Sequence, residues 1–191
     1  LFRKKDDALV AHPRGKAASS YTVPQGTSAV GERAFDSCSF LTSVSLPASV
    51  TEIDDYAFSD CSALVEVSIP SSVDEIGSCA FNYCTALSSI VIPDSVTEIE
   101  EGAFSECRAL TTVVLPNSLT EISDYLFSYC ASLSSILIPD SVTEIETGAF
   151  QSCTALVSIV IPDSVTEIED IAFFQCSAPV SYTHLRAHET E

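Results

Sequence analysis

The chain has 191 residues, a formal net charge of −19, and neither methionine nor tryptophan. Residues 24–178 contain 23 acidic side chains but only two basic ones, Arg33 and Arg108. Nucleic acids and anionic membranes bind cationic surfaces, so this composition argues against both as direct ligands. No apolar run approaches the roughly 20 residues that a membrane-spanning helix needs, so we expect no direct membrane insertion.

Residues 1–17 combine charged side chains with Pro13 and Gly15 and show no period. We expect a disordered leader here. Because the chain lacks a starting methionine and its first residues read like the interior of a protein, we also expect it to be a fragment. Residues 18–24 then match the phase of residues 87–93, so the repeats are expected to begin at Ala18.

From that point, three residue types recur every 23 residues. Proline does so from Pro24 to Pro162, phenylalanine from Phe35 to Phe173, and cysteine from Cys38 to Cys176. A fixed period of this length indicates a solenoid, in which each coil buries its apolar side against its neighbours. We predict about seven 23-residue coils over residues 18–178.

Each coil contains three kinds of segment. Leu133, Ile136 and Ile138 alternate as in a strand, and the following proline ends it because proline cannot donate to a ladder. The apolar pair Val142 and Ile145 predicts a short strand or turn in the segment after this proline, where the chain runs back toward the start of the next coil. In residues 149–153 a phenylalanine and a cysteine three residues apart would share one face of a single helical turn.

Identical residues in stacked coils should form files through the interior. The expected structural ladder consists of Phe58, Phe81, Phe104, Phe127, Phe150 and Phe173 with Cys61, Cys84, Cys107, Cys130, Cys153 and Cys176. A spacing of about 5 Å between coils is compatible with disulfides, but parallel side-chain directions favour free, buried thiols. Leu126 stands where the other coils have alanine, so we expect a local bulge there.

Residues 179–191 fit no repeat column. They resemble a translated sequencing-adaptor segment, so we predict a non-repeat tail that is derived from an adaptor. On that interpretation, the natural chain was cut and further coils or a cap are missing.

The repeated pattern is Ile-Pro, Val-Thr-x-Ile, Ala-Phe-x-x-Cys and Leu-x-x-Val-x-Ile. It resembles the BspA-like (Treponema-type) leucine-rich repeat family over about residues 18–178. The resemblance implies a leucine-rich repeat solenoid with parallel β-strands on its concave face, and short strands, turns and single helical turns on the convex side. It also implies protein binding, often in surface adhesion, with a cell-surface or secreted location and no catalytic residues.

The residues themselves also argue against an enzyme. The three histidines, His12, His184 and His188, all lie outside the repeats, so a serine or cysteine nucleophile there would have no histidine base. The six glycines are scattered and form no phosphate-binding loop. We therefore expect no catalytic residue and no cofactor.

Two groups of carboxylates remain as candidates for chemistry. Glu98, Glu121, Glu144 and Glu167 recur once per coil. Such a file of carboxylates is either a hydrated edge that keeps the protein in solution or a weak binding site for divalent cations such as Ca²⁺. A second group precedes the predicted helical turn, where acids are stabilised by exposed amides. Its members are Asp54, Asp55, Glu100, Glu101, Asp124, Glu146, Glu169 and Asp170.

The outward positions of the predicted concave strands form a candidate binding surface. Four consecutive aliphatic residues stand beside a file of hydroxyl side chains. We define them together as the strip: Val91, Val114, Leu137 and Val160, with Ser89, Thr112, Ser135 and Ser158. A protein ligand of unknown identity would bind there, although β-propensity alone could also explain the aliphatic residues.

The sequence thus favours a non-enzymatic protein-binding or cell-surface adhesion module. One alternative is a structural or regulatory repeat segment of a larger protein whose catalytic part is absent from this fragment. Another is an ice-facing Ser/Thr ladder, formed by the serines at 49, 72, 95, 118, 141 and 164 with neighbouring threonines.

Overall fold

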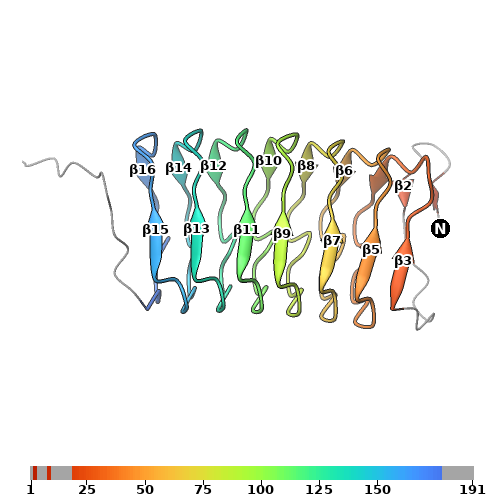
Figure 1. Cartoon of the computed structure of the whole chain (residues 1–191), viewed down its shortest axis with the longest axis horizontal. Coiled ribbons are helices and arrows are strands. Elements are labelled where there is room, and N and C mark those ends of the chain that lie inside the picture. The colour runs from red at the N-terminus through yellow and green to blue at the C-terminus, as the bar shows by residue number, and fades with distance from the viewer. Residues whose placement is uncertain (1, 4–7, 10–18, 178–191) are drawn as a thin grey trace, which may run out of the picture.

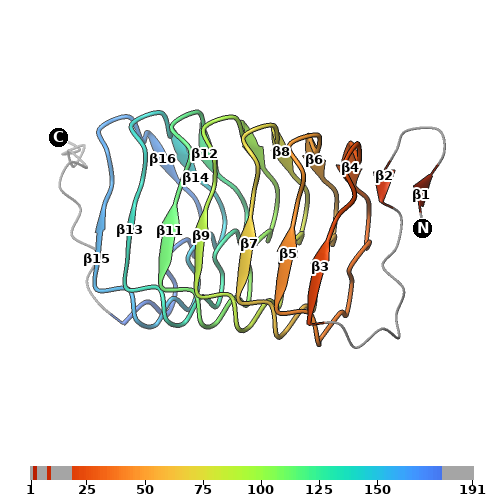
Figure 2. The same ribbon diagram turned by 45° about the vertical axis from the view of Figure 1, so that its right-hand side comes forward.

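The computed structural model describes residues 2–3, 8–9 and 19–177. Within them the chain forms coils that stack along one axis as a parallel β-solenoid (Figure 1). Strands from successive coils follow one another along that axis, and Figure 2 shows that they lie on two different sides of the stack. The predicted solenoid of 23-residue coils is confirmed.

The first sheet consists of three-residue strands, one from each coil. Each has an inward side chain between two outward ones, except at the N-terminal β3. Its strands are β3 (Ser20–Thr22), β5 (Ser43–Ser45), β7 (Glu66–Ser68), β9 (Ser89–Val91), β11 (Thr112–Val114), β13 (Ser135–Leu137) and β15 (Ser158–Val160). This sheet corresponds to the face that the sequence analysis assigned to the concave side.

The second sheet consists of two-residue strands on the return path. Its strands are β4 (Ala29–Val30), β6 (Glu52–Ile53), β8 (Glu75–Ile76), β10 (Glu98–Ile99), β12 (Glu121–Ile122), β14 (Glu144–Ile145) and β16 (Glu167–Ile168). Glu52 pairs with Glu75, and Glu121 pairs with Glu144, so equivalent residues of paired coils face one another in register.

Two further short strands lie within the region expected to be a disordered leader. They are β1 (Phe2–Arg3) and β2 (Ala8–Leu9), and Leu9 pairs with Val30 of β4. The remainder of that leader lies outside the described residues, as do Ala18 and the predicted tail over 179–191.

The sequence predicts single helical turns on the convex side. This prediction is wrong, because the described residues form no helix. Tight turns replace it, and each coil contains two left-handed residues four apart, such as Tyr56 (φ 55°) and Asp60 (φ 57°). These residues interrupt a right-handed helix. Alternate amides therefore bond within the coil, as in Ala57 N–H to Asp54 C=O, and to the next coil, as in Phe58 N–H to Ala80 C=O at 2.7 Å.

The core is a set of files along the stacking axis. The phenylalanine rings stack with centroids 4.9–5.9 Å apart and with interplanar angles of at most 17°. Rings from Phe35 to Phe150 are fully buried, whereas Phe173 in the last coil is only partly buried. Removal of these large apolar surfaces from water is the main stabilising contribution to the fold.

The cysteine file makes a hydrogen bond that sequence reasoning did not foresee. Each buried thiol donates to the carbonyl of a phenylalanine 26 residues earlier, as Cys107 does to Phe81 at 3.2 Å. Burial raises the pKa of Cys107 to about 12, so its thiol stays protonated at neutral pH. Cys61, Cys84, Cys107, Cys130 and Cys153 are free, buried thiols, in agreement with the prediction.

Replacing Phe104 with alanine should lower the free energy of unfolding by about 3–5 kcal/mol, because it removes a fully buried ring from the middle of the stack. Urea denaturation followed by circular dichroism measures this loss. Phe174→Ala is the matched control, because Phe174 is 51 % exposed and its truncation should change stability little. A loss below about 1 kcal/mol for Phe104→Ala would contradict the central role of the ring stack.

Candidate functional site

The residues of the strip all lie on the exposed side of the first sheet. Val91, Val114, Leu137 and Val160 are 63, 48, 74 and 53 % exposed. The four hydroxyl residues next to them are exposed as well. The structure therefore presents a continuous file of aliphatic side chains to solvent, as the sequence analysis expected.

The strands of the strip are paired two by two. Val91 is in register with Val114 between β9 and β11, and Leu137 with Val160 between β13 and β15. Strands β11 and β13 lie side by side without a continuous ladder. The strip thus consists of two hydrogen-bonded pairs of strands placed next to one another.

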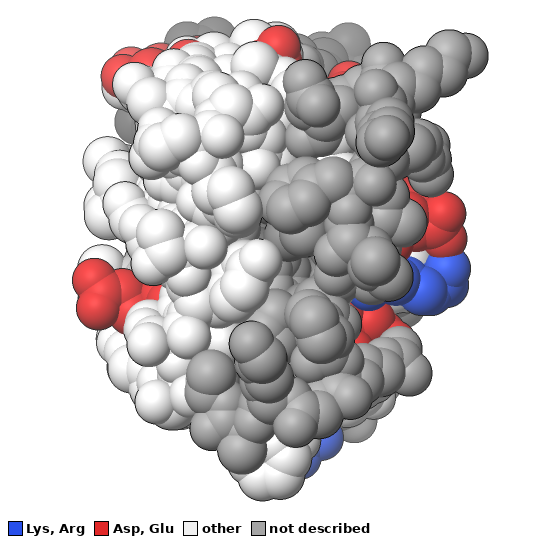
Figure 3. All heavy atoms as spheres, turned by 90° about the vertical axis from the view of Figure 1, so that its right-hand side faces the viewer, with Lys and Arg blue, Asp and Glu red and all other residues white. Residues whose placement is uncertain are grey.

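The first-sheet face carries little charge. Among its outward strand positions in β5 to β15 only Glu66 is ionisable, while Asp94, Asp140 and Asp163 lie in the turns that follow the strands. In the end-on view of Figure 3, the side bearing the first sheet, on the left, is mostly neither acidic nor basic. An apolar file with a partly acidic border can bury aliphatic side chains of a partner and attract basic ones at its edge.

The second sheet carries the acidic face of the molecule. The glutamates at 121, 144 and 167 follow one another in register, whereas Glu98 pairs with Glu75 and not with Glu121. The predicted file is therefore interrupted between Glu98 and Glu121.

Two clefts of about 320 Å³ each open on this face. The N-terminal cleft is lined by Glu32, Glu52, Asp54, Asp55, Glu75, Gly77 and Glu100. Gly77 permits the close approach of neighbouring coils there, because a Cβ at this position would lie 2.7 Å from the backbone nitrogen of Asp55. The second cleft lies between β10 and β12 and is called the seam cleft below.

Three of the eight acids assigned to a helix N-terminus, namely Asp54, Asp55 and Glu100, instead accept hydrogen bonds from amides of adjacent coils. Asp54 Oδ2 accepts the Glu32 N–H at 3.1 Å, and Asp55 Oδ1 accepts the Ser78 N–H at 2.9 Å. Glu100 Oε2 also accepts the Ser78 N–H, at 3.1 Å. Sequence reasoning separated these acids from the glutamate file, but the coil winding places both groups on one face.

Loss of water and crowding of carboxylates raise the pKa values of several acids on this face. Loss of water around Glu52 raises its pKa from 4.5 to about 7, and the charge of Asp54 and a hydrogen bond with it contribute further. The pKa values of Glu75, Glu144 and Glu146 are also raised, first by loss of water and then by the charges of neighbouring carboxylates.

The structure brings together three acids that could take part in cation binding. Carboxylate oxygens of Glu144, Glu167 and Glu169 lie within 4.8 Å of one another. Ca²⁺ takes six to eight oxygen ligands in proteins, and these three carboxylates would supply three to six of them, depending on whether each binds through one oxygen or two. Cation binding by Glu98, Glu121, Glu144 and Glu167 stays a prediction.

The serine file that suggested an ice-facing surface has an internal role. The half-buried hydroxyls of Ser72, Ser95 and Ser141 donate to the carbonyls of Val50, Val73 and Leu119 in the preceding coils. These hydroxyls tie successive coils together, so they do not form a freely exposed Ser/Thr lattice.

Comparison with known proteins agrees with this architecture. The model of the BspA type leucine rich repeat region matches residues 14–131 and 75–185 in six copies, so the chain belongs to this family. No curated protein matches the chain. The described residues contain no helix of sufficient length and apolar character to cross a bilayer.

Solved structures of related proteins share the fold. A leucine-rich repeat protein from Bacteroides ovatus is 33 % identical with a TM-score of 0.80, over 85 % of this chain and 42 % of that one. The T. pallidum leucine-rich repeat protein is 34 % identical with a TM-score of 0.78, over 85 % and 79 %. A leucine rich cell surface protein from Faecalibacterium prausnitzii is 30 % identical with a TM-score of 0.60, over 88 % and 60 %. The chain thus spans less than half of the B. ovatus protein.

The acidic face should make stability depend on pH. The carboxyl pKa of Glu52 is higher in the folded than in the unfolded chain, so its stabilising contribution is fully present below about pH 4.5 and is lost as the pH rises through about 7. We expect the melting temperature to fall between these pH values, as measured by differential scanning calorimetry.

Glu52→Gln should make this decline shallower, because it removes the titrating group with the pKa near 7. Thr51→Ser is the control, since it changes the neighbouring exposed residue without altering a titratable group. A melting temperature that rises over the same pH range would contradict the carboxylate crowding described here.

Proposed function

We propose that this protein is a non-enzymatic recognition module that binds a protein ligand through the strip on its first sheet. The observation that carries the proposal is the file of four exposed aliphatic side chains on consecutive coils, Val91, Val114, Leu137 and Val160. Scattered exposed apolar residues are normal on protein surfaces, but a contiguous apolar file on a sheet is typical of an interaction site.

The chemistry of the surface restricts the ligand. The complementary partner has aliphatic side chains spaced to meet successive coils, with lysine or arginine residues beside them to approach Asp94, Asp140 and Asp163. Residues 24–178 carry 23 acidic side chains and two basic ones. This negative charge favours a basic partner, and association with such a partner should be faster at low salt.

Family membership supports a binding scaffold, and adhesion at the cell surface is the finer part of the proposal. The F. prausnitzii relative is described as a cell surface protein, and we extend that location to this chain as a hypothesis. The chain covers only 42 % of the B. ovatus relative, so a role as the repeat segment of a larger protein is compatible with the same binding surface.

Peptides selected on the immobilised protein from a random displayed library serve as probes for this surface. Val114→Ser combined with Leu137→Ser should weaken the selected peptides by at least about 10-fold, since burial of each aliphatic side chain contributes about 1.5–3 kcal/mol. Isothermal titration calorimetry at fixed salt measures the change.

The matched control is Phe40→Ser combined with Ile171→Ser, which removes two exposed apolar residues outside the strip, 73 and 45 % exposed. This variant should bind the peptides as tightly as the parent protein. Selected peptides that bind the Val114/Leu137 variant with undiminished affinity would contradict the proposal.

A further inference from the structure

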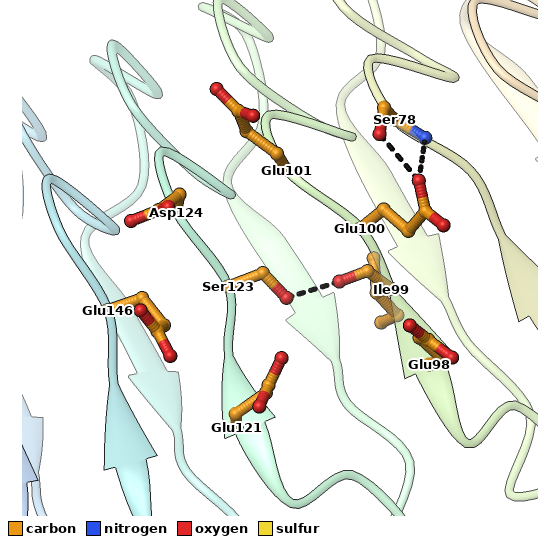
Figure 4. A pocket seen from close by; sticks show the side chains of 9 residues that line it. All are labelled: Ser78, Glu98, Ile99, Glu100, Glu101, Glu121, Ser123, Asp124 and Glu146. Carbon is orange, nitrogen blue, oxygen red and sulfur yellow. Dashed lines mark hydrogen bonds between the residues drawn. The ribbon is translucent and has the colours of Figure 1, made fainter.

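Within the described residues, the second sheet from β4 to β16 is interrupted at one place, between β10 and β12. At the equivalent positions on either side, the Glu100 N–H bonds to the Ile76 carbonyl and the Glu146 N–H to the Ile122 carbonyl, both at 2.9 Å. Between β10 and β12 the Ser123 side-chain hydroxyl donates to the Ile99 carbonyl in place of the amide (Figure 4). A flexible side chain has thus replaced a rung of the backbone ladder.

A second rung is absent at the same junction. The Thr97 N–H bonds to the Asp74 carbonyl at 2.9 Å, and the Thr143 N–H bonds to the Thr120 carbonyl at 2.8 Å. In the described structure no corresponding bond joins the Thr120 N–H to the preceding coil. The amides of Thr120 and Ser123 therefore lack the inter-coil protection that their equivalents have.

The coil that contains β12 has larger side chains on both sides of that strand. Leu119 stands where Val96 and Val142 stand in the adjacent coils, and Leu126 stands where they have alanine. Both leucines are buried. Additional carbon atoms in a tightly packed interior force neighbouring elements apart, which gives a physical reason for the missing pairing between β12 and β10.

The distance between successive phenylalanine rings also differs at this junction. The centroids of Phe104 and Phe127, which flank this junction, are 5.9 Å apart, the largest spacing in the stack. The three preceding spacings, from Phe35 to Phe104, are 4.9, 5.1 and 5.3 Å, and the two that follow, from Phe127 to Phe173, are 5.6 and 5.4 Å. The turn that carries Leu126 keeps its bond from the Phe104 N–H to the Leu126 carbonyl, so the expected local bulge there stays a prediction.

Both lips of the seam cleft are acidic. Glu98, Glu100 and Glu101 lie on the side of β10, and Glu121, Asp124 and Glu146 lie on the side of β12 and β14 (Figure 4). Carboxylates on opposite lips repel one another, and dissolved salt screens this repulsion. Electrostatics at this cleft therefore favour opening at low ionic strength.

The other two sides of the same junction remain closed. Strands β9 and β11 of the first sheet are paired in register, and on the turn side the Gly102 N–H bonds to the Asp124 carbonyl at 2.8 Å. The Phe104 N–H also bonds to the Leu126 carbonyl at 3.1 Å. Separation at the second sheet alone would bend the rod without dividing it.

We propose that the junction between β10 and β12 is a built-in hinge. The solenoid bends there by opening and closing the acid-lined seam cleft, with the ladder of β9 and β11 acting as the pivot. Opening changes the curvature of the first sheet on the opposite side of the coils. The bond from Ser123 to the Ile99 carbonyl is the latch that holds the closed form.

Amide hydrogen exchange resolved by NMR tests the hinge in the full chain. The Ser123 and Thr120 amides should exchange at least about 10-fold faster, relative to their intrinsic rates, than the equivalent amides of Glu146 and Thr143. Raising the sodium chloride concentration from 0.05 M to about 1 M should slow the two seam amides relative to those references. Equal protection of the seam and reference amides in the parent protein would overturn the proposal.

Two matched double variants test the cause. Leu119→Val with Leu126→Ala gives the coil of β12 the residues of its neighbours and should slow exchange at Ser123 to the rate of Glu146. Val96→Leu with Ala103→Leu places the larger pair in the preceding coil and should accelerate exchange at Glu100, whose bond to Ile76 it would break. Exchange at Glu100 unchanged in the second variant would overturn the assignment of the hinge to these side chains, even if the first variant is destabilised by a cavity.

Discussion

The structure depends on one constraint, namely that every coil has the same length, so that each inter-coil hydrogen bond finds its partner 22 to 26 residues away. The amides of Phe35 to Phe150, the buried cysteine thiols and the turn serines from Ser49 to Ser141 bond to adjacent coils in this way. No coil can bury its apolar side alone, and each depends on its neighbours for both packing and hydrogen bonding. Equal coil length therefore determines the fold and also places equivalent side chains in files on each face.

That file arrangement separates two surfaces with different chemistry. The outward positions of the first sheet collect valine, leucine, serine and threonine, while the second sheet and the adjoining turns collect carboxylates. The apolar file can bury a partner's side chains, and on the acidic face loss of water, followed by the charge of neighbouring carboxylates, raises the carboxyl pKa of residues such as Glu52. Each coil contributes only one or two such side chains to a face, and repetition over several coils makes each surface extended.

The sequence predicts the structural features that repeat in every coil. It does not predict the structure where one coil differs from the others, or where the backbone conformation is not indicated by residue type. The 23-residue spacing of Phe104 and its equivalents was sufficient to predict the solenoid and the buried ring stack. It does not reveal that Tyr56 and Asp60 adopt left-handed conformations, because neither residue is a glycine, and the Phe–Cys spacing alone therefore predicts a helical turn where the structure has tight turns. Leu126 was recognisable as an exception, but the missing rungs at Thr120 and Ser123 depend on how neighbouring coils respond to its volume, which no single-residue pattern contains.

The most direct test of the equal-length constraint compares two deletions in the middle of the array. Removing residues 93–115 deletes one complete period of 23 residues, and removing residues 93–114 deletes one residue fewer. Urea denaturation should show cooperative unfolding for the first variant, with lower stability than the parent, and loss of folded structure or a large additional destabilisation for the second. Equal stability of the two variants would contradict the account, because the stacking of files would then tolerate a shift in register.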